Sequence, residues 1–169
     1  YTHEVDPNAT AGGKERIAPF VFRKYLDYSA IAEIRDMKQK INRDVEQKGR
    51  MKRDVKLGYG GIREIEFVIQ ALQLIYAGRE RTLRERNALK ALHILSQKGL
   101  ISYREHEVLS RAYVFLRTVE HRIQIVDDLQ TQTLPGDEDG LRALARRMGY
   151  FEPHRETEAL LRDYADHTK

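Results

Sequence analysis

The sequence of 169 residues contains no cysteine, no tryptophan and only four prolines. The absence of cysteine excludes a disulfide framework and a thiolate metal site, and it agrees with a reducing compartment. No apolar run approaches the roughly 18 residues that a transmembrane helix needs, and no secretory signal peptide is visible. We therefore expect a cytoplasmic protein that has no membrane partner.

The alternation of apolar and polar residues that marks half-buried strands is also almost absent. Apolar residues instead recur at helical spacing, and 33% of the residues are charged, which is typical of solvated helices. A chain of this length fits one domain. We predict an all-α fold, a helical bundle of about six to seven helices with one long central helix.

The helical pattern appears in six segments that are separated by turn residues. These segments cover residues 29–49, 62–77, 82–98, 102–130, 140–148 and 153–167. Thr82 is a candidate N-cap for the third segment, and Ser102 with Glu105 forms a capping box at the start of the fourth. The acidic residues at 137–139 are candidate caps for the fifth segment.

The first 16 residues are polar and contain Pro7, Gly12 and Gly13, which is typical of a lead-in segment or linker. The helical pattern predicts that residues 17–169 form the domain itself. Because the chain begins at Tyr1 rather than at methionine, we interpret it as a piece of a longer, multidomain protein.

The most informative motif is a glycine-rich loop, in which three of the four residues from 58 to 61 are glycine. Glycine lets the backbone turn sharply and approach a ligand, and the helix that follows would direct unpaired N–H groups at the turn. Lys56 and Arg63 flank this point. We predict that Lys56, Gly60, Gly61 and Arg63 bind a phosphate or nucleotide. The alternative is a loop that only starts a helix, because the motif matches neither a Walker A loop nor a dinucleotide fingerprint.

Polar side chains interrupt two otherwise apolar helix faces. Glu66, Gln70 and Gln73 follow one another at helical spacing, and Glu120 lies beside the apolar stripe of the long segment. Buried polar groups need partners, so these side chains either form an interhelical network or support a ligand. The candidate cations for Glu120 are Lys56, Arg63 and Arg122.

The sequence contains no complete active site. It has no Ser/His/Asp or Cys/His arrangement and no paired aspartates of the G-S-x-x-D-x-D kind. His121 has no second histidine at metal-binding spacing, and we predict no metal ligands. The net charge is +4, which could attract a nucleotide, a nucleic acid or an acidic protein. Because basic and aromatic residues do not alternate, we expect no nucleic-acid partner.

Three sequence blocks occur in order between residues 19 and 135. The first block combines Pro-Phe-Val-Phe-Arg-Lys-Tyr-Leu-Asp-Tyr at 19–28 with Ile-Arg-Asp-Met-Lys at 34–38. The second runs from Lys56 through the glycine loop and Arg-Glu-Ile-Glu-Phe to Gln70. The third combines residues 116–124 with the stretch from Asp128 to Thr-Leu-Pro at 133–135. Together these blocks resemble the glutamine synthetase adenylyltransferase family.

The resemblance implies a part of a large bifunctional enzyme with two nucleotidyltransferase halves. One half would transfer AMP from ATP to a tyrosine of glutamine synthetase, and the other would remove it by phosphorolysis and release ADP. The PII signalling protein and glutamine would set the balance. Mg²⁺ and ATP or ADP would bind aspartates of a domain that is missing here, so we expect this fragment to be inactive alone.

Within such an enzyme the chain resembles the helical domain that follows the N-terminal, adenylyl-removing half. We expect it to close the nucleotide cleft, with Glu66, Gln70 and Glu120 as supporting polar residues. Tyr59 departs from the pattern as a bulky insertion that limits how closely a ligand could approach.

Three other interpretations stay open. The related PII uridylyltransferase has a comparable glycine stretch, although the Glu-Ile-Glu-Phe and Thr-Leu-Pro blocks argue against it. A pure interaction module could instead dock PII or glutamine synthetase without touching nucleotide. A nucleic-acid-binding bundle fits least well, and it would require binding with a steep salt dependence.

Overall fold

The computed structural model describes residues 21, 32, 36, 39, 53–127, 132–152 and 154–169. These residues form five α-helices and one short 3-10 helix, and their only bridge of β type pairs Asp54 with Thr133. The predicted all-α fold is therefore confirmed. The lead-in at 1–16 lies outside the described residues, as does the helix at 29–49 apart from isolated positions.

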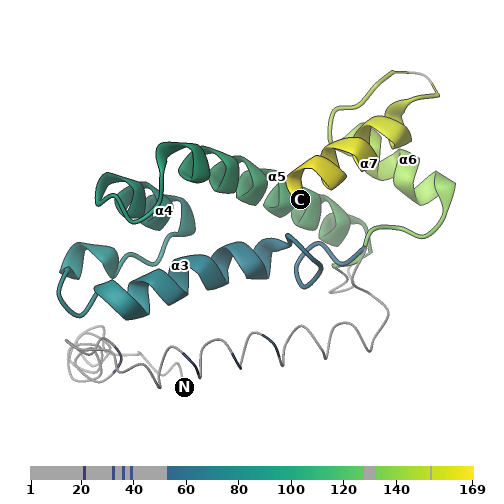
Figure 1. Ribbon diagram of the computed structural model, residues 1–169. Coiled ribbons are helices and arrows are strands. Elements are labelled where there is room, and N and C mark those ends of the chain that lie inside the picture. The colour runs from purple at the N-terminus through teal and green to yellow at the C-terminus, as the bar shows by residue number, and fades with distance from the viewer. Residues whose placement is uncertain are drawn as a thin grey trace, which may run out of the picture.

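The long helix α5 (Tyr103–Asp127) is the centre of the bundle. It packs against all four of the other helices (Figure 1). These are α3 (Ile62–Tyr76), α4 (Ala88–Gln97), α6 (Glu138–Arg147) and α7 (Glu156–His167). The helix α3 runs alongside α5, whereas α4 lies near one end of α5 and the α6–α7 pair near the other. The prediction of one long central helix is confirmed.

The core consists of apolar residues that follow the helical repeat on each element. They include Ile62, Ile65 and Ile69 of α3, Leu92 and Leu95 of α4, Leu116 and Val119 of α5, Leu144 of α6 and Leu160 of α7. Each fully buried side chain of this size contributes about 1.5–3 kcal/mol relative to an exposed one. Burial of these stripes, rather than the propensity of single helices, holds α3 against α5.

Two of the predicted helix caps are confirmed. The backbone N–H of Ser102 donates to Glu105 Oε2 at 2.7 Å, and the N–H of Glu105 donates to Ser102 Oγ at 3.2 Å. Asp137 Oδ1 accepts a hydrogen bond from the N–H of Gly140 at 2.7 Å and caps α6. These caps satisfy N–H groups that a helix start leaves without an intrahelical partner.

The predicted N-cap at Thr82 is wrong. The segment divides into a 3-10 helix, η1 (Arg81–Leu83), and α4, whose N-cap is Asn87. Thr82 acts as a donor instead, because its Oγ1 donates to Glu80 Oε1 at 2.8 Å. Asn87 Oδ1 accepts from the N–H of Lys90 at 3.0 Å, as expected of a residue type that is favoured at this position.

Candidate functional site

The glycine-rich loop, residues 53–61, is fixed by the buried residue Asp54. Asp54 Oδ1 accepts hydrogen bonds from the N–H groups of Lys56 at 2.9 Å and Leu57 at 2.8 Å. The backbone N–H of Val55 donates to the Gln132 carbonyl at 2.9 Å, so the loop is also tied to the segment that follows α5. Two of the three sequence blocks therefore meet at this loop.

The N–H groups in the first turn of α3 are already paired. Ile62 donates to the Val55 carbonyl at 3.1 Å, and Arg63 donates to the Lys56 carbonyl at 2.9 Å. Glu64 donates to the Gly61 carbonyl at 3.0 Å. The expectation of unpaired N–H groups at this helix start is therefore wrong, because the loop folds back and its own carbonyls cap the helix.

The two predicted glycines are closely packed. Gly60 has φ +63°, and a Cβ placed on it would lie 2.6 Å from the carbonyl carbon of Thr168. A Cβ on Gly61 would lie 2.9 Å from the carbonyl oxygens of Val55 and Lys56. Both positions thus need glycine for the fold itself, and the end of α7 occupies the space over Gly60.

The side chains of Lys56 and Arg63 are both reached by solvent, although Lys56 is shared with Glu120. Lys56 lies at the edge of the loop with 30% of its side chain exposed, and its Nζ is 3.7 Å from Glu120 Oε1. Arg63 is exposed on the first turn of α3. Among the residues that the structure describes, no carboxylate forms an ion pair with Arg63.

Arg117 of α5 connects the two carboxylates that the sequence pattern singled out. Its NH2 donates to Glu66 Oε1 of α3 at 2.8 Å, and its NH1 donates to Glu120 Oε2 at 2.8 Å. Arg117 also lies over the ring of Tyr113, with 5.3 Å between the guanidinium carbon and the ring centroid. Only 3% of the Glu120 side chain is exposed, so its buried negative charge requires the positive charges of Arg117 and Lys56 beside it.

The network joins two cations and two carboxylates on the loop, α3 and α5. Burial opposes the charge on Arg117, but the hydrogen bonds that Arg117 donates to Glu120 and Tyr113 outweigh it and raise the pKa of Arg117 above its ordinary value. Arg117 therefore stays charged throughout the physiological range. We name Lys56, Glu66, Arg117 and Glu120 the charge network.

Of the three candidate cations for Glu120, Lys56 forms an ion pair with it, whereas neither Arg63 nor Arg122 does so among the described residues. Sequence reasoning missed Arg117 as the bridge. The signal was present, because Arg117 and Glu120 are spaced i, i+3 on one helix. The contact between Arg117 and Glu66 depends on how α3 and α5 pack, which no local pattern reveals.

The three polar side chains that interrupt the apolar face of α3 lie in different environments. Glu66 enters the charge network, and Gln70 is exposed. Gln73 Nε2 donates to the carbonyls of Leu83 at 2.8 Å and Glu85 at 2.7 Å. Gln73 is thus an interhelical connector, and only Glu66 lies near the predicted site.

Nothing in the described part of the chain forms a group of three metal-binding side chains. The carboxylates at the loop are all engaged. Asp54 accepts from the N–H groups of Lys56 and Leu57, and Glu64 Oε2 accepts from the N–H of Gly60 at 3.0 Å. Glu66 and Glu120 are both bound by Arg117. A Mg²⁺ ion prefers carboxylates that are free to coordinate it and usually retains several waters. The described residues therefore do not fit a magnesium site of their own.

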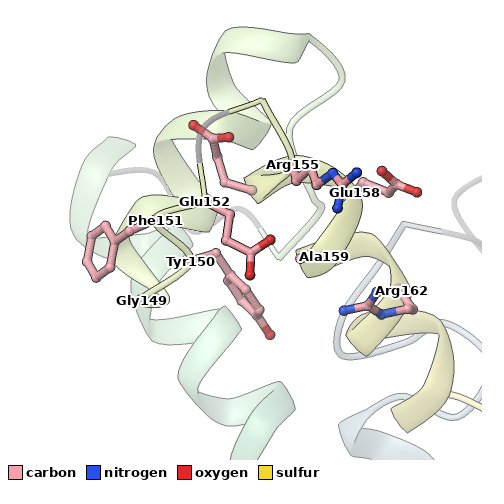
Figure 2. Close-up of a pocket in the computed structure, with 9 residues that line it drawn as sticks. Gly149, Tyr150, Phe151, Glu152, Arg155, Glu158, Ala159 and Arg162 are labelled. Carbon is pink, nitrogen blue, oxygen red and sulfur yellow. The ribbon is translucent and has the colours of Figure 1, made fainter.

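A separate cavity of about 520 Å³ lies between the α6–α7 connection and α7. Figure 2 shows Glu152 and Arg162 among the side chains on its wall, together with Tyr150. Tyr150 is fixed there, because its hydroxyl donates to Asp163 at 2.5 Å. The wall carries both signs of charge, which does not suit phosphate, and none of the predicted site residues lines this cavity.

A family model described as GlnD PII-uridylyltransferase matches residues 35–169. The chain belongs to this family. Its curated relatives include proteins named bifunctional glutamine synthetase adenylyltransferase/adenylyl-removing enzyme. The protein from Hahella chejuensis is 45% identical over 79% of the chain, and that from Acinetobacter baylyi is 49% identical over 74%. The protein from Mannheimia haemolytica is 46% identical over 74% of the chain.

These findings confirm the resemblance to the glutamine synthetase adenylyltransferases. The matched family model is described by the name of the PII uridylyltransferase, which was one of the alternative interpretations of the sequence. The three relatives are instead named as glutamine synthetase adenylyltransferases. The chain covers only 13–14% of the length of these relatives. In its described part, no helix has both the length and the apolar character that crossing a membrane requires.

Proposed function

We propose that the chain is the helical domain that closes the nucleotide cleft in the adenylyl-removing half of a bifunctional glutamine synthetase adenylyltransferase. The names of the relatives support the enzyme class. One structural observation carries the specific role. The ammonium group of Lys56 is held at the loop by Glu120, and the Lys56 carbonyl accepts at 2.9 Å from the backbone N–H of Arg63, whose side chain is exposed on the first turn of α3.

The reaction that we propose is phosphorolysis of the bond between AMP and a tyrosine of glutamine synthetase. An oxygen of orthophosphate attacks the phosphorus of AMP, and the bond from phosphorus to the tyrosine oxygen breaks. The proton that the orthophosphate loses passes to the tyrosine oxygen, so that tyrosine and ADP are released. Bound Mg²⁺ would neutralise phosphate charge from a neighbouring domain of the parent enzyme. Lys56 and Arg63 would contribute the two positive charges of this domain to the same phosphate groups.

The anion contacts in this proposal come from side chains rather than from backbone amides. The first-turn amides of α3 donate to loop carbonyls, and the end of α7 covers Gly60. Gly60 and Gly61 would act indirectly, because they let the loop hold Lys56 beside Arg63. Glu66 and Glu120 would position the cations through the charge network.

The proposed partners follow from the same assignment. Glutamine synthetase would be the protein substrate, and ADP or ATP the nucleotide bound in the cleft. PII signalling protein and glutamine would regulate the parent enzyme. The competing interpretation is a docking module without nucleotide contact, and it predicts that no side chain of the loop affects the use of orthophosphate.

Arg63→Ala in the full-length parent enzyme tests the proposal. We expect removal of AMP from adenylylated glutamine synthetase to fall roughly 100-fold, because an electrostatic contact to the transferred phosphate is lost. Adenylylation by the other half would be unchanged. Arg104→Ala, which removes an exposed cation from α5, is the matched control. If both activities of Arg63→Ala equalled those of the wild type, the cleft-closing role would be wrong.

A further inference from the structure

The turn between α3 and α4 is strongly basic. Residues 76–90 contain five arginines or lysines and two glutamates, which give a net charge of +3 out of +4 for the whole sequence. In Figure 1 this turn lies at the end of α3 away from the glycine loop. The 15 residues of α3 separate the two places by about 22 Å.

In the described part of the chain, neither glutamate of this turn forms an ion pair with Arg81, Arg86 or Lys90. Glu80 is bound by Lys98 at 2.7 Å and by the Thr82 hydroxyl at 2.8 Å. The Glu85 carboxylate accepts from the backbone N–H groups of Arg86 at 2.7 Å and Asn87 at 2.8 Å. Both acids therefore shape the turn, while Arg81, Arg86 and Lys90 are exposed to solvent.

The turn is held by hydrogen bonds to its own backbone. Gln73 Nε2 binds the carbonyls of Leu83 and Glu85, and Arg84 Nε donates to the Ala77 carbonyl at 3.0 Å. The side chain of Leu83 anchors the turn in the core with 1% exposure. A surface that is already ordered loses little conformational entropy when it binds a partner.

Apolar side chains accompany the exposed cations. Tyr76 is 41% exposed and Leu89 is 36% exposed, and both flank the turn in sequence. Arg81, Arg86 and Lys90 are exposed, and in the described part of the chain none of the three forms an ion pair. Tyrosine and arginine are the residue types that most often dominate the binding energy of protein interfaces.

We propose that this basic corner, formed by Tyr76, Arg81, Arg86, Leu89 and Lys90, binds an acidic surface of the protein substrate. Cations interspersed with a tyrosine and a leucine suit a protein surface, in which carboxylates lie among apolar groups. A nucleic acid would instead favour a continuous strip of cations along its phosphates. Binding far from the reacting phosphate orients a macromolecular substrate without entering the cleft.

The identity of the substrate as glutamine synthetase rests on the proposed function, and the test keeps the two apart. The full-length parent enzyme would carry Arg81→Glu, Arg86→Glu and Lys90→Glu together. We expect the KM for adenylylated glutamine synthetase to rise roughly tenfold and its salt dependence to weaken, because the complementary charges now repel. The kcat and the KM for orthophosphate would stay at the wild-type values.

A control variant with the same change in charge would carry Arg104→Glu, Arg111→Glu and Arg147→Glu, at three cations that are exposed elsewhere on the surface. Its KM for glutamine synthetase is expected to stay near the wild-type value. An equal rise in both variants would overturn the proposal, because net charge alone would then explain the effect. An unchanged KM in the corner variant would also overturn it.

Two further measurements make the test independent of turnover and of folding. Equilibrium titration of adenylylated glutamine synthetase without orthophosphate measures binding even if Arg63 proves irrelevant to catalysis. A milder variant with Arg81→Gln, Arg86→Gln and Lys90→Gln is expected to weaken binding in the same direction by a smaller factor. Binding to a short RNA duplex is measured for the wild type and the corner variants as well. If the wild type bound the duplex, and the corner variants lost this binding but still bound glutamine synthetase normally, the corner would be assigned to nucleic acid and the proposal would be overturned.

Discussion

The carbonyl group of Thr168, just beyond the end of α7, lies directly against Gly60 of the glycine-rich loop. A Cβ at residue 60 would approach the Thr168 carbonyl carbon to 2.6 Å. The last turn of α7 also contacts α5, because the rings of His167 and Phe115 are 4.6 Å apart between centroids. The loop that holds Lys56 is therefore braced by the opposite end of the described chain.

Gly60→Ala is expected to lower the free energy of unfolding by about 2–4 kcal/mol, from backbone strain at positive φ and from the clash with Thr168. Gly99 provides the matched control, since it has φ +69° but a Cβ added there would meet no other atom within 4 Å. Gly99→Ala should cost only the strain, about 1 kcal/mol. Urea denaturation measures both values, and equal losses would show that Thr168 does not constrain the loop.

The sequence pattern predicted the local features of this fold well. The second predicted helix, 62–77, agrees with α3 at Ile62–Tyr76, and the capping box at Ser102 marks the start of α5 within one residue. These features depend on residues that are close in sequence. The N-cap prediction for Thr82 was wrong because a hydroxyl can donate a hydrogen bond as well as accept one. In the structure Thr82 donates to the Glu80 carboxylate instead of accepting from a backbone N–H.

The candidate site was less predictable, because its decisive contacts join distant segments. Thr168 covers Gly60, and Arg117 reaches Glu66 across 51 positions in the chain. The glycines predicted a loop whose backbone a phosphate could approach. In the structure the space above Gly60 is filled by backbone from the end of α7. That Glu120 would need a cation was predictable, because it lies beside an apolar stripe, but the sequence left Lys56, Arg63 and Arg122 as alternatives.

Arg117→Met is expected to lower the free energy of unfolding by about 2–4 kcal/mol, because Glu120 stays buried with less compensation for its charge. Lys56 would then be its remaining partner, at 3.7 Å. Arg111→Met on the same helix removes a side chain that is 67% exposed and pairs only with Glu107 among the described residues, so it should cost less than about 0.5 kcal/mol. Similar losses in the two variants would mean that the charge network adds nothing to stability.

Tyr164 of α7 gives the stability a specific dependence on alkaline pH. Burial raises the pKa of Tyr164 from 10.0 to about 12, and the negative charge of Asp54 adds to the effect. The folded state therefore keeps this proton when the unfolded state releases it. The contribution is complete below the ordinary pKa and is lost as the pH rises from 10 towards 12.

Tyr164→Phe should remove this component. The difference in unfolding free energy between wild type and variant is expected to be constant up to about pH 9 and to shrink as the pH rises above the unfolded pKa. Urea titrations at a series of alkaline pH values measure it, and groups shared by both proteins cancel in the difference. A difference that does not vary with pH would show that Tyr164 titrates alike in both states.

Gln73→Leu tests whether the basic corner is held by a single amide. The substitution leaves the carbonyls of Leu83 and Glu85 without their donor, which should cost about 1–3 kcal/mol of unfolding free energy. Gln70→Leu, at an exposed position on the same helix, should change it by less than about 0.5 kcal/mol. Hydrogen exchange should also accelerate around η1 in Gln73→Leu alone. If the two variants matched in stability and exchange, the turn would owe its order to Leu83 and Arg84 instead.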